Sequence, residues 1–75
     1  DVAELAEITF YPNPTSGKVT FNQMIEQIDV IDITGKNIET FSNTYEINIE
    51  TLKSGVYYLR LLYEDKVMLK KLIKQ

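Results

Sequence analysis

The chain has 75 residues, a net charge of −3, and neither cysteine nor histidine. This length allows one domain with a modest core. The composition excludes a disulfide framework, a cysteine nucleophile and the usual zinc ligands, and the acidic balance argues against a nucleic-acid surface. The sequence therefore predicts a small domain that is stabilised by packing alone.

Charge is distributed unevenly along the chain. Residues 1–65 contain all 11 acidic residues and four of the eight basic residues, whereas residues 66–75 contain Lys66, Lys70, Lys71 and Lys74 and no acid. Two interpretations remain open: lysines that protect an edge strand from pairing, or a basic tail presented to an acidic partner.

Apolar and polar residues alternate in short runs that turn residues separate, which predicts β-strands. Residues 1–7 are interpreted as a linker. The pattern breaks at Tyr11–Gly17, where Pro12 and Pro14 each fix φ and remove a backbone donor, and Gly17 can supply a positive φ. This segment is predicted to be a rigid corner. The seven expected strands are Ile8–Tyr11, Lys18–Asn22, Ile28–Ile33, Lys36–Phe41, Tyr45–Ile49, Val56–Tyr63 and Val67–Ile73.

The run Val56–Tyr63 carries bulky residues on both faces, which is typical of an interior strand. Thr34-Gly35 is expected to be a hairpin turn, and Met24–Gln27 an irregular connection. Seven short strands favour an all-β, immunoglobulin-like antiparallel β-sandwich. Tyr57 follows the loop into the penultimate strand and is a candidate for the tyrosine corner of such sandwiches.

Candidate catalytic groups are few. Asp29 and Asp32 are three residues apart in a strand, which sends them to opposite faces as solvated carboxylates unless a bulge realigns them. Thr34-Gly35-Lys36 lacks the preceding glycine and following helix of a phosphate loop. The sequence therefore predicts no enzyme and no cofactor. Tyr11, Tyr58 and Tyr63 leave open a sugar-binding or adhesive β-sandwich, which would require them to be coplanar and exposed to solvent.

Four blocks of sequence together resemble a known family. They are Phe10–Gly17 (FYPNPTSG), Ile28–Lys36 (IDVIDITGK), Leu52–Leu59 (LKSGVYYL) and Lys70–Lys74 (KKLIK). In this order they are similar to the C-terminal sorting domain of the type IX secretion system of Bacteroidetes, over residues 8–75. Asp32 and Ile33 depart modestly from the family pattern.

The resemblance implies an address on a larger secreted protein. An N-terminal cargo domain would cross the periplasm, the outer-membrane translocon and its shuttle protein would recognise residues 8–75, and a sortase-like cysteine protease would cleave within or before residues 1–7. The cargo would then be released or attached at the cell surface. An exposed last strand also makes an edge-to-edge dimer plausible.

The family motif is carried over residue by residue. We expect Lys70, Lys71, Lys74 and the exposed part of the Tyr11–Gly17 corner to make the recognition contacts. The full set of matching residues is Pro12, Asn13, Pro14, Gly17, Gly35, Leu52, Gly55, Tyr57, Lys70, Lys71, Ile73 and Lys74.

Overall fold

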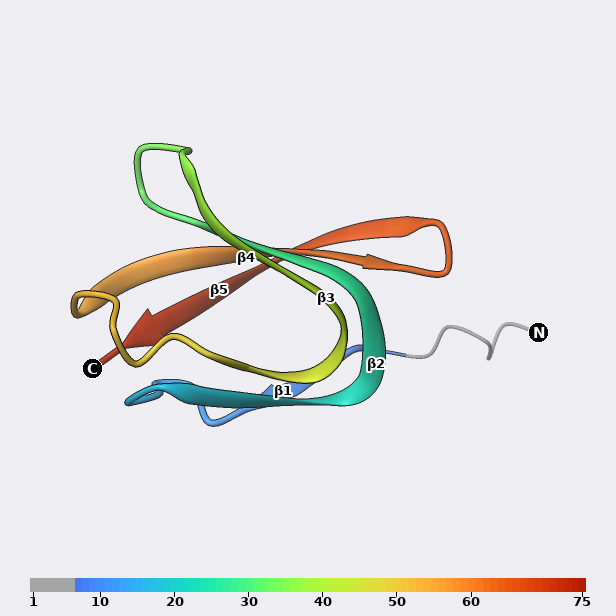
Figure 1. Ribbon diagram of the computed structural model, residues 1–75, viewed down its shortest axis with the longest axis horizontal. Coiled ribbons are helices and arrows are strands. Elements are labelled where there is room, and N and C mark those ends of the chain that lie inside the picture. Colours follow the sequence, from blue (N-terminus) through green and yellow to red (C-terminus); the bar gives the residue numbers. More distant parts are fainter. Residues whose placement is uncertain (1–6) are drawn as a thin grey trace.

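The computed structural model describes residues 7–75, which form five β-strands and no helix (Figure 1). The prediction of an all-β antiparallel domain is confirmed, but the predicted number of seven strands is wrong. Residues 1–6 of the expected linker lie outside the described part. The strands are β1 (Phe10–Tyr11), β2 (Lys18–Ile31), β3 (Asn37–Asn48), β4 (Gly55–Tyr63) and β5 (Lys66–Lys74).

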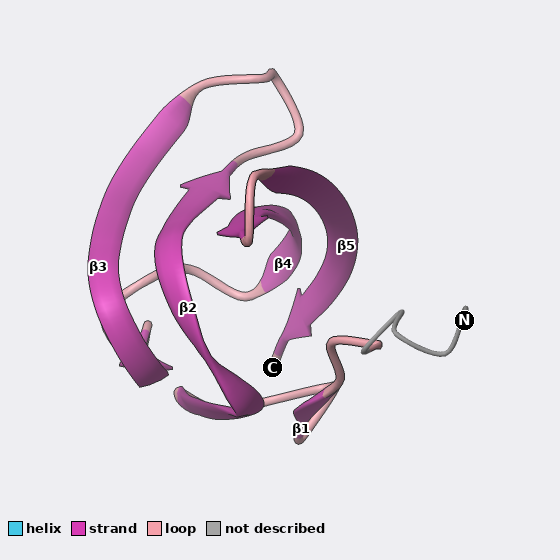
Figure 2. Ribbon diagram, turned by 90° about the vertical axis from the view of Figure 1, so that its right-hand side faces the viewer, coloured by secondary structure: helices cyan, strands magenta, loops and turns pink. Residues whose placement is uncertain are grey.

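All five strands belong to one antiparallel sheet. The order is β1-β2-β4-β5, and β3 pairs with the other edge of β2. Figure 2 shows how the sheet curls, so that β3, β2, β4 and β5 follow one another around the interior. The expected hairpin at Thr34-Gly35 joins β2 to β3, and a two-residue turn joins β4 to β5.

Two pairs of predicted strands are each one long strand. β2 includes Lys18–Asn22 and the first four residues of the expected strand Ile28–Ile33, because the expected connection at Met24–Gln27 is itself extended. β3 includes most of the expected strands Lys36–Phe41 and Tyr45–Ile49. The register of β2 against β3 shifts between Thr20 and Ile25, as at a β-bulge, and bulges bend a strand without ending it. Both β2 and β3 bend, so their halves lie in two layers (Figure 1).

The core lies inside the curl. Ile25, which is fully buried, lies beyond the register shift in β2, and the rings of Phe10 and Phe21 pack with their centroids 5.4 Å apart. Alternate residues of β4 point inward, as the period-two pattern requires, whereas in β2 the inward parity changes between Ile25 and Ile28. The buried apolar residues are Ile8, Val19, Phe21, Ile25, Ile28, Val30, Ile47, Ile49, Tyr57, Leu59, Leu61 and Leu72.

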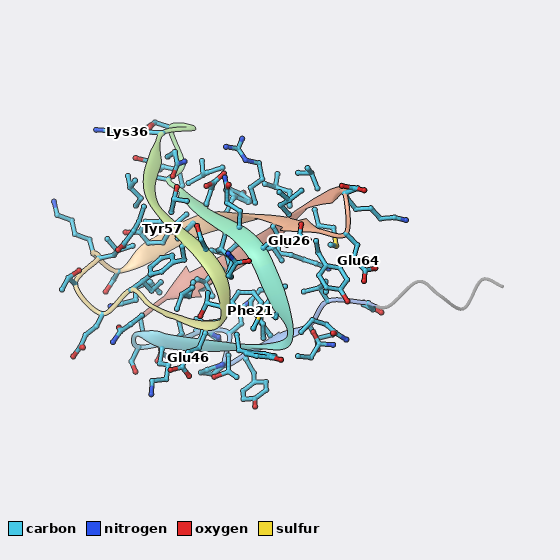
Figure 3. The ribbon with its side chains drawn as sticks, turned by 45° about the vertical axis from the view of Figure 1, so that its right-hand side comes forward. Phe21, Glu26, Lys36, Glu46, Tyr57 and Glu64 are labelled. Carbon is cyan, nitrogen blue, oxygen red and sulfur yellow. The ribbon has the colours of Figure 1, made fainter. Side chains whose placement is uncertain are left out.

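Strand β4 is an interior strand, as predicted, because it lies between β2 and β5. Tyr57, Leu59 and Leu61 fill the core from this strand. The hydroxyl of Tyr57 donates a hydrogen bond of 2.7 Å to the carbonyl oxygen of Lys53, four residues upstream. This is the bond expected of a tyrosine corner. Figure 3 shows Tyr57 and Phe21 on the inside of the curled sheet.

Candidate functional site

The corner between β1 and β2 is bonded to the end of the last strand. The carboxamide of Asn13 donates to the carbonyl oxygen of Lys71 (3.0 Å) and accepts from the amide of Ile73 (2.9 Å). The Thr15 amide donates a hydrogen bond to the Ile73 carbonyl oxygen (2.9 Å). The Gln75 amide in turn donates to the Thr15 carbonyl oxygen (2.8 Å). The corner therefore acts as a short extra strand beside β5.

Thr15 and Gly17 fix the shape of this corner. The buried Thr15 hydroxyl donates to the Lys18 carbonyl oxygen (2.8 Å) and accepts from the Gly17 amide (3.0 Å). A Cβ atom at Gly17 would lie 3.1 Å from Cβ and 3.2 Å from Cα of Glu50. The expectation that Gly17 supplies a positive φ is wrong, because only Gly35 and Gly55 among the described glycines have one. Gly17 is needed because two backbone segments approach closely.

The segment between β3 and β4 meets the same corner. The Ile49 amide donates to the Gly17 carbonyl oxygen (2.9 Å), and Leu52 packs against the core. Gly55 has a φ of 152° at the start of β4 and pairs with Lys74. We call the residues 12–17, 49–55 and 71–75 the motif junction. It unites the first, third and fourth sequence blocks that the resemblance identified.

The second block lies elsewhere. Gly35, with a φ of 91°, sits in the turn at the tip of the β2–β3 hairpin, where Figure 3 labels its neighbour Lys36. The carboxylate of Asp32 accepts hydrogen bonds from the Thr34 hydroxyl and from the amides of Thr34 and Lys36. The Thr34 hydroxyl, followed by the Lys36 amide, lowers the pKa of Asp32 below its ordinary value. The predicted hairpin turn is confirmed.

The basic residues of β5 differ in exposure. Lys71 is exposed, Lys70 is half-buried and Ile73 is 38% exposed. Lys74 is only 8% exposed, and its Nζ atom donates to the main-chain oxygen of Gln75. The expectation that Lys74 presents its charge to a partner is therefore wrong. It follows Leu72 on the inner face of β5, and Thr15 pairs with it at the edge of the strand.

A partly buried ion pair between Asp29 and Arg60 was not predicted from the sequence. Asp29 was expected to be solvated but is 3% exposed. Its carboxylate accepts hydrogen bonds from the Arg60 guanidinium (2.9 and 3.0 Å), the Thr40 hydroxyl (2.8 Å) and the Gln27 carboxamide. Burial alone would raise the pKa of Asp29, but the hydrogen bonds from Thr40, Arg60 and Gln27 lower it. Arg60, a single cation within an apolar run, was the available signal.

The tyrosines do not form a flat platform. Tyr58 and Tyr63 point to opposite faces of β4, since they are an odd number of residues apart. Tyr63 packs against the core and donates to the Gln23 carboxamide oxygen (3.3 Å), whereas Tyr11 is 63% exposed on β1. This arrangement lacks the coplanar aromatic row that a sugar-binding face requires.

Residues 7–75 contain neither a cluster of metal ligands nor a membrane-spanning helix. No group of three or more acidic residues lies close enough together to hold a metal ion. No helix in this part of the chain has the length and apolar character needed to cross a membrane.

The fold and the motif junction define the class of this protein as a small all-β domain made of one curled antiparallel sheet. The family model for the secretion system C-terminal sorting domain matches residues 9–75. The chain therefore belongs to this family of type IX secretion sorting domains. No curated protein sequence matches it. Membership supports a C-terminal sorting signal for secretion to the cell surface or the extracellular space.

Proposed function

We propose that residues 8–75 direct an N-terminal cargo domain through the outer-membrane translocon of the type IX system, with the motif junction as the surface that is recognised. The domain is a non-catalytic address. Its cargo passes through the periplasm, its contacts are with the translocon and its shuttle protein, and a sortase-like cysteine protease removes it within or before residues 1–7.

The observation that carries this proposal is the convergence of three sequence blocks at one end of the sheet. Asn13 contacts Lys71 and Ile73, Gly17 accepts a hydrogen bond from Ile49, and Lys74 lies between Gly55 and Thr15. A receptor that reads a folded shape needs such a fixed surface, and the backbone hydrogen bonds supply its rigidity.

The exposed side chains of the motif junction are the ones available for contact. Pro12, Pro14 and Lys71 are exposed, and Ile73 is partly so. Lys70 is half-buried and lies on the inner face of β5, as Leu72 does. Gly17, Leu52 and Tyr57 serve the same surface indirectly, because they hold the segments that form it.

The proposal is tested with a fluorescent reporter that is directed to the periplasm and carries the 75-residue chain at its C-terminus, in a bacterium that has a type IX apparatus. We expect the reporter to be found on the cell surface or in the medium. Mass spectrometry of the secreted reporter should locate the cleavage site within or before residues 1–7. Lys71→Glu should retain the reporter in the periplasm. Lys36→Glu, the same charge change at the hairpin tip, should not.

Removal of residues 66–75 is a poor variant for this test, because it deletes β5 and the buried Leu72, and we expect the remaining sheet to unfold. Lys71→Glu leaves the Lys71 carbonyl oxygen bonded to Asn13. A fusion that stays in the periplasm with the domain shown to be folded would refute the sorting role. Secretion of the Lys71→Glu fusion at the wild-type level would move recognition away from the motif junction.

A further inference from the structure

The edge of β5 is covered by the chain itself along only part of its length. Lys71 and Ile73 direct backbone groups away from β4 and bond them to Asn13 and Thr15. Successive residues of a strand alternate in this direction, so Val67 and Leu69 direct their amides and carbonyls to the same edge. Within residues 7–75, no hydrogen bond to these groups is formed. Four backbone groups are thus available at the first half of β5.

A recess lies on the outer face beside this free edge. Its volume is about 530 Å³, and its apolar walls come from the second half of β2, the following turn, β4 and β5. Ile33, Val67 and Leu69 are 74%, 65% and 63% exposed. A recess of this size takes several side chains. The residues that line it and matter here are Ile33, Tyr58, Val67, Leu69, the cation Arg60 and one carboxylate, Asp32.

The charge around this edge favours an acidic occupant. β5 contains no acidic residue, and of its four lysines only Lys74 is buried at the corner. Lys66 and Lys71 are exposed on either side of the free groups, whereas Lys70 is half-buried and points to the inner face of β5. Two β5 strands that paired with each other would bring lysines together, and like charges on neighbouring strands are destabilising. An acidic strand would meet lysines instead.

We propose that the free edge of β5 binds an extended peptide segment in which acidic and apolar residues alternate. The segment adds a strand by hydrogen-bonding to Val67 and Leu69, and its apolar side chains enter the recess. Asn13 limits its length, because the corner occupies the edge from Lys71 onward. This binding rests on the geometry of β5 and does not depend on the sorting role.

The test uses the isotope-labelled 75-residue chain and a blocked peptide of about seven residues in which glutamate and valine alternate, the length of a typical short strand. A lysine–valine peptide of equal length is the control. Amide chemical shifts should change at Val67, Leu69 and Ile33. Affinity should be at least tenfold higher for the acidic peptide and should fall between low salt and about 0.3 M salt.

Two variants separate the backbone from the recess. Val67→Pro removes an edge amide that does not pair with β4, so the fold is retained and binding is lost. Leu69→Asp places a like charge at the recess and should weaken binding at least tenfold. Tyr45→Asp, on the exposed edge strand β3, is the matched control and should bind as the wild type does.

Three results would overturn the proposal. Equal affinity for the acidic and basic peptides would show that the lysines of β5 do not select an acidic segment. Shift changes confined to residues outside β5 and the recess would place the peptide elsewhere. Concentration-dependent shifts on β3 and β5 without peptide would identify a second copy as the occupant, because β3 carries only acidic charges, Glu39 and Glu46.

Discussion

Asn13 is the side chain on which the closure of the corner depends, and its replacement by alanine tests that role directly. Asn13→Ala removes two hydrogen bonds, one to the Lys71 carbonyl oxygen (3.0 Å) and one from the Ile73 amide (2.9 Å). The Thr15 and Gln75 bonds remain. The corner should therefore loosen at its proline end while the rest of the domain stays folded.

The magnitude follows from these two bonds. A hydrogen bond contributes about 0.5–1.5 kcal/mol net to stability. Because Asn13 is exposed, water can bond to the groups that lose their partner, and this reduces the total cost of losing both bonds. Asn13→Ala should therefore lower the free energy of unfolding by about 1–2 kcal/mol, or roughly 4–16 °C in Tm for a domain of this size. Asn13→Asp keeps the acceptor for the Ile73 amide and loses the donor, so it should cost about half as much.

Thermal unfolding by circular dichroism gives the Tm, and amide hydrogen exchange gives the local effect. The Ile73 amide should exchange faster in Asn13→Ala, because it loses its acceptor. The Leu72 amide points toward β4 and serves as the internal control. A Tm within about 1 °C of wild type, with unchanged exchange at Ile73, would show that the Asn13 carboxamide does not hold the corner.

Three other variants, two single and one double, test further features of the fold. Gly17→Ala should destabilise the domain by about 1–3 kcal/mol in urea unfolding, because its Cβ would press on neighbouring backbone. Arg60→Met should cost about 1–3 kcal/mol at neutral pH by leaving the buried carboxylate of Asp29 without its cation. The pKa of Asp29 is lowered, so this carboxylate stabilises the fold above its ordinary value of 3.8 and loses that effect as the pH falls further. The difference between Arg60→Met and wild type should therefore shrink in acid, and a constant difference from pH 7 to about pH 2 would refute the ion-pair argument. Glu64→Asn with Asp65→Gly should raise the unfolding free energy by about 1 kcal/mol, since both residues have a positive φ (50° and 66°), and an unchanged Tm would contradict this.

The positions of the strands were predictable because period-two alternation is a local property of the sequence. The number of strands was not. Whether Met24–Gln27 ends a strand or bends it depends on the partner strand, and β3 lies across the bend and keeps both halves of β2 in one ladder. Nothing within those four residues records that contact.

The site shows the same limit. The corner was recognised from Pro12 and Pro14, but its partner lies about sixty residues away in sequence, where Asn13 meets Lys71 and Ile73. The last strand was ambiguous, because both alternations of Val67–Ile73 include apolar residues. Only the structure shows that Leu72 points inward, which also places Lys74 on the buried face.

Some motif residues hold the segments of the motif junction in place, and others present exposed side chains on its surface. Gly17, Gly55 and Tyr57 have structural reasons to be present: a close backbone approach, a positive φ, and a hydrogen bond from a buried ring. A substitution at any of them alters the shape of the motif junction before it alters a contact. If the address is read as a folded shape, loss of secretion in such variants should follow their loss of stability. Lys71→Glu, which changes charge without removing a backbone hydrogen bond, should instead reduce secretion at wild-type stability.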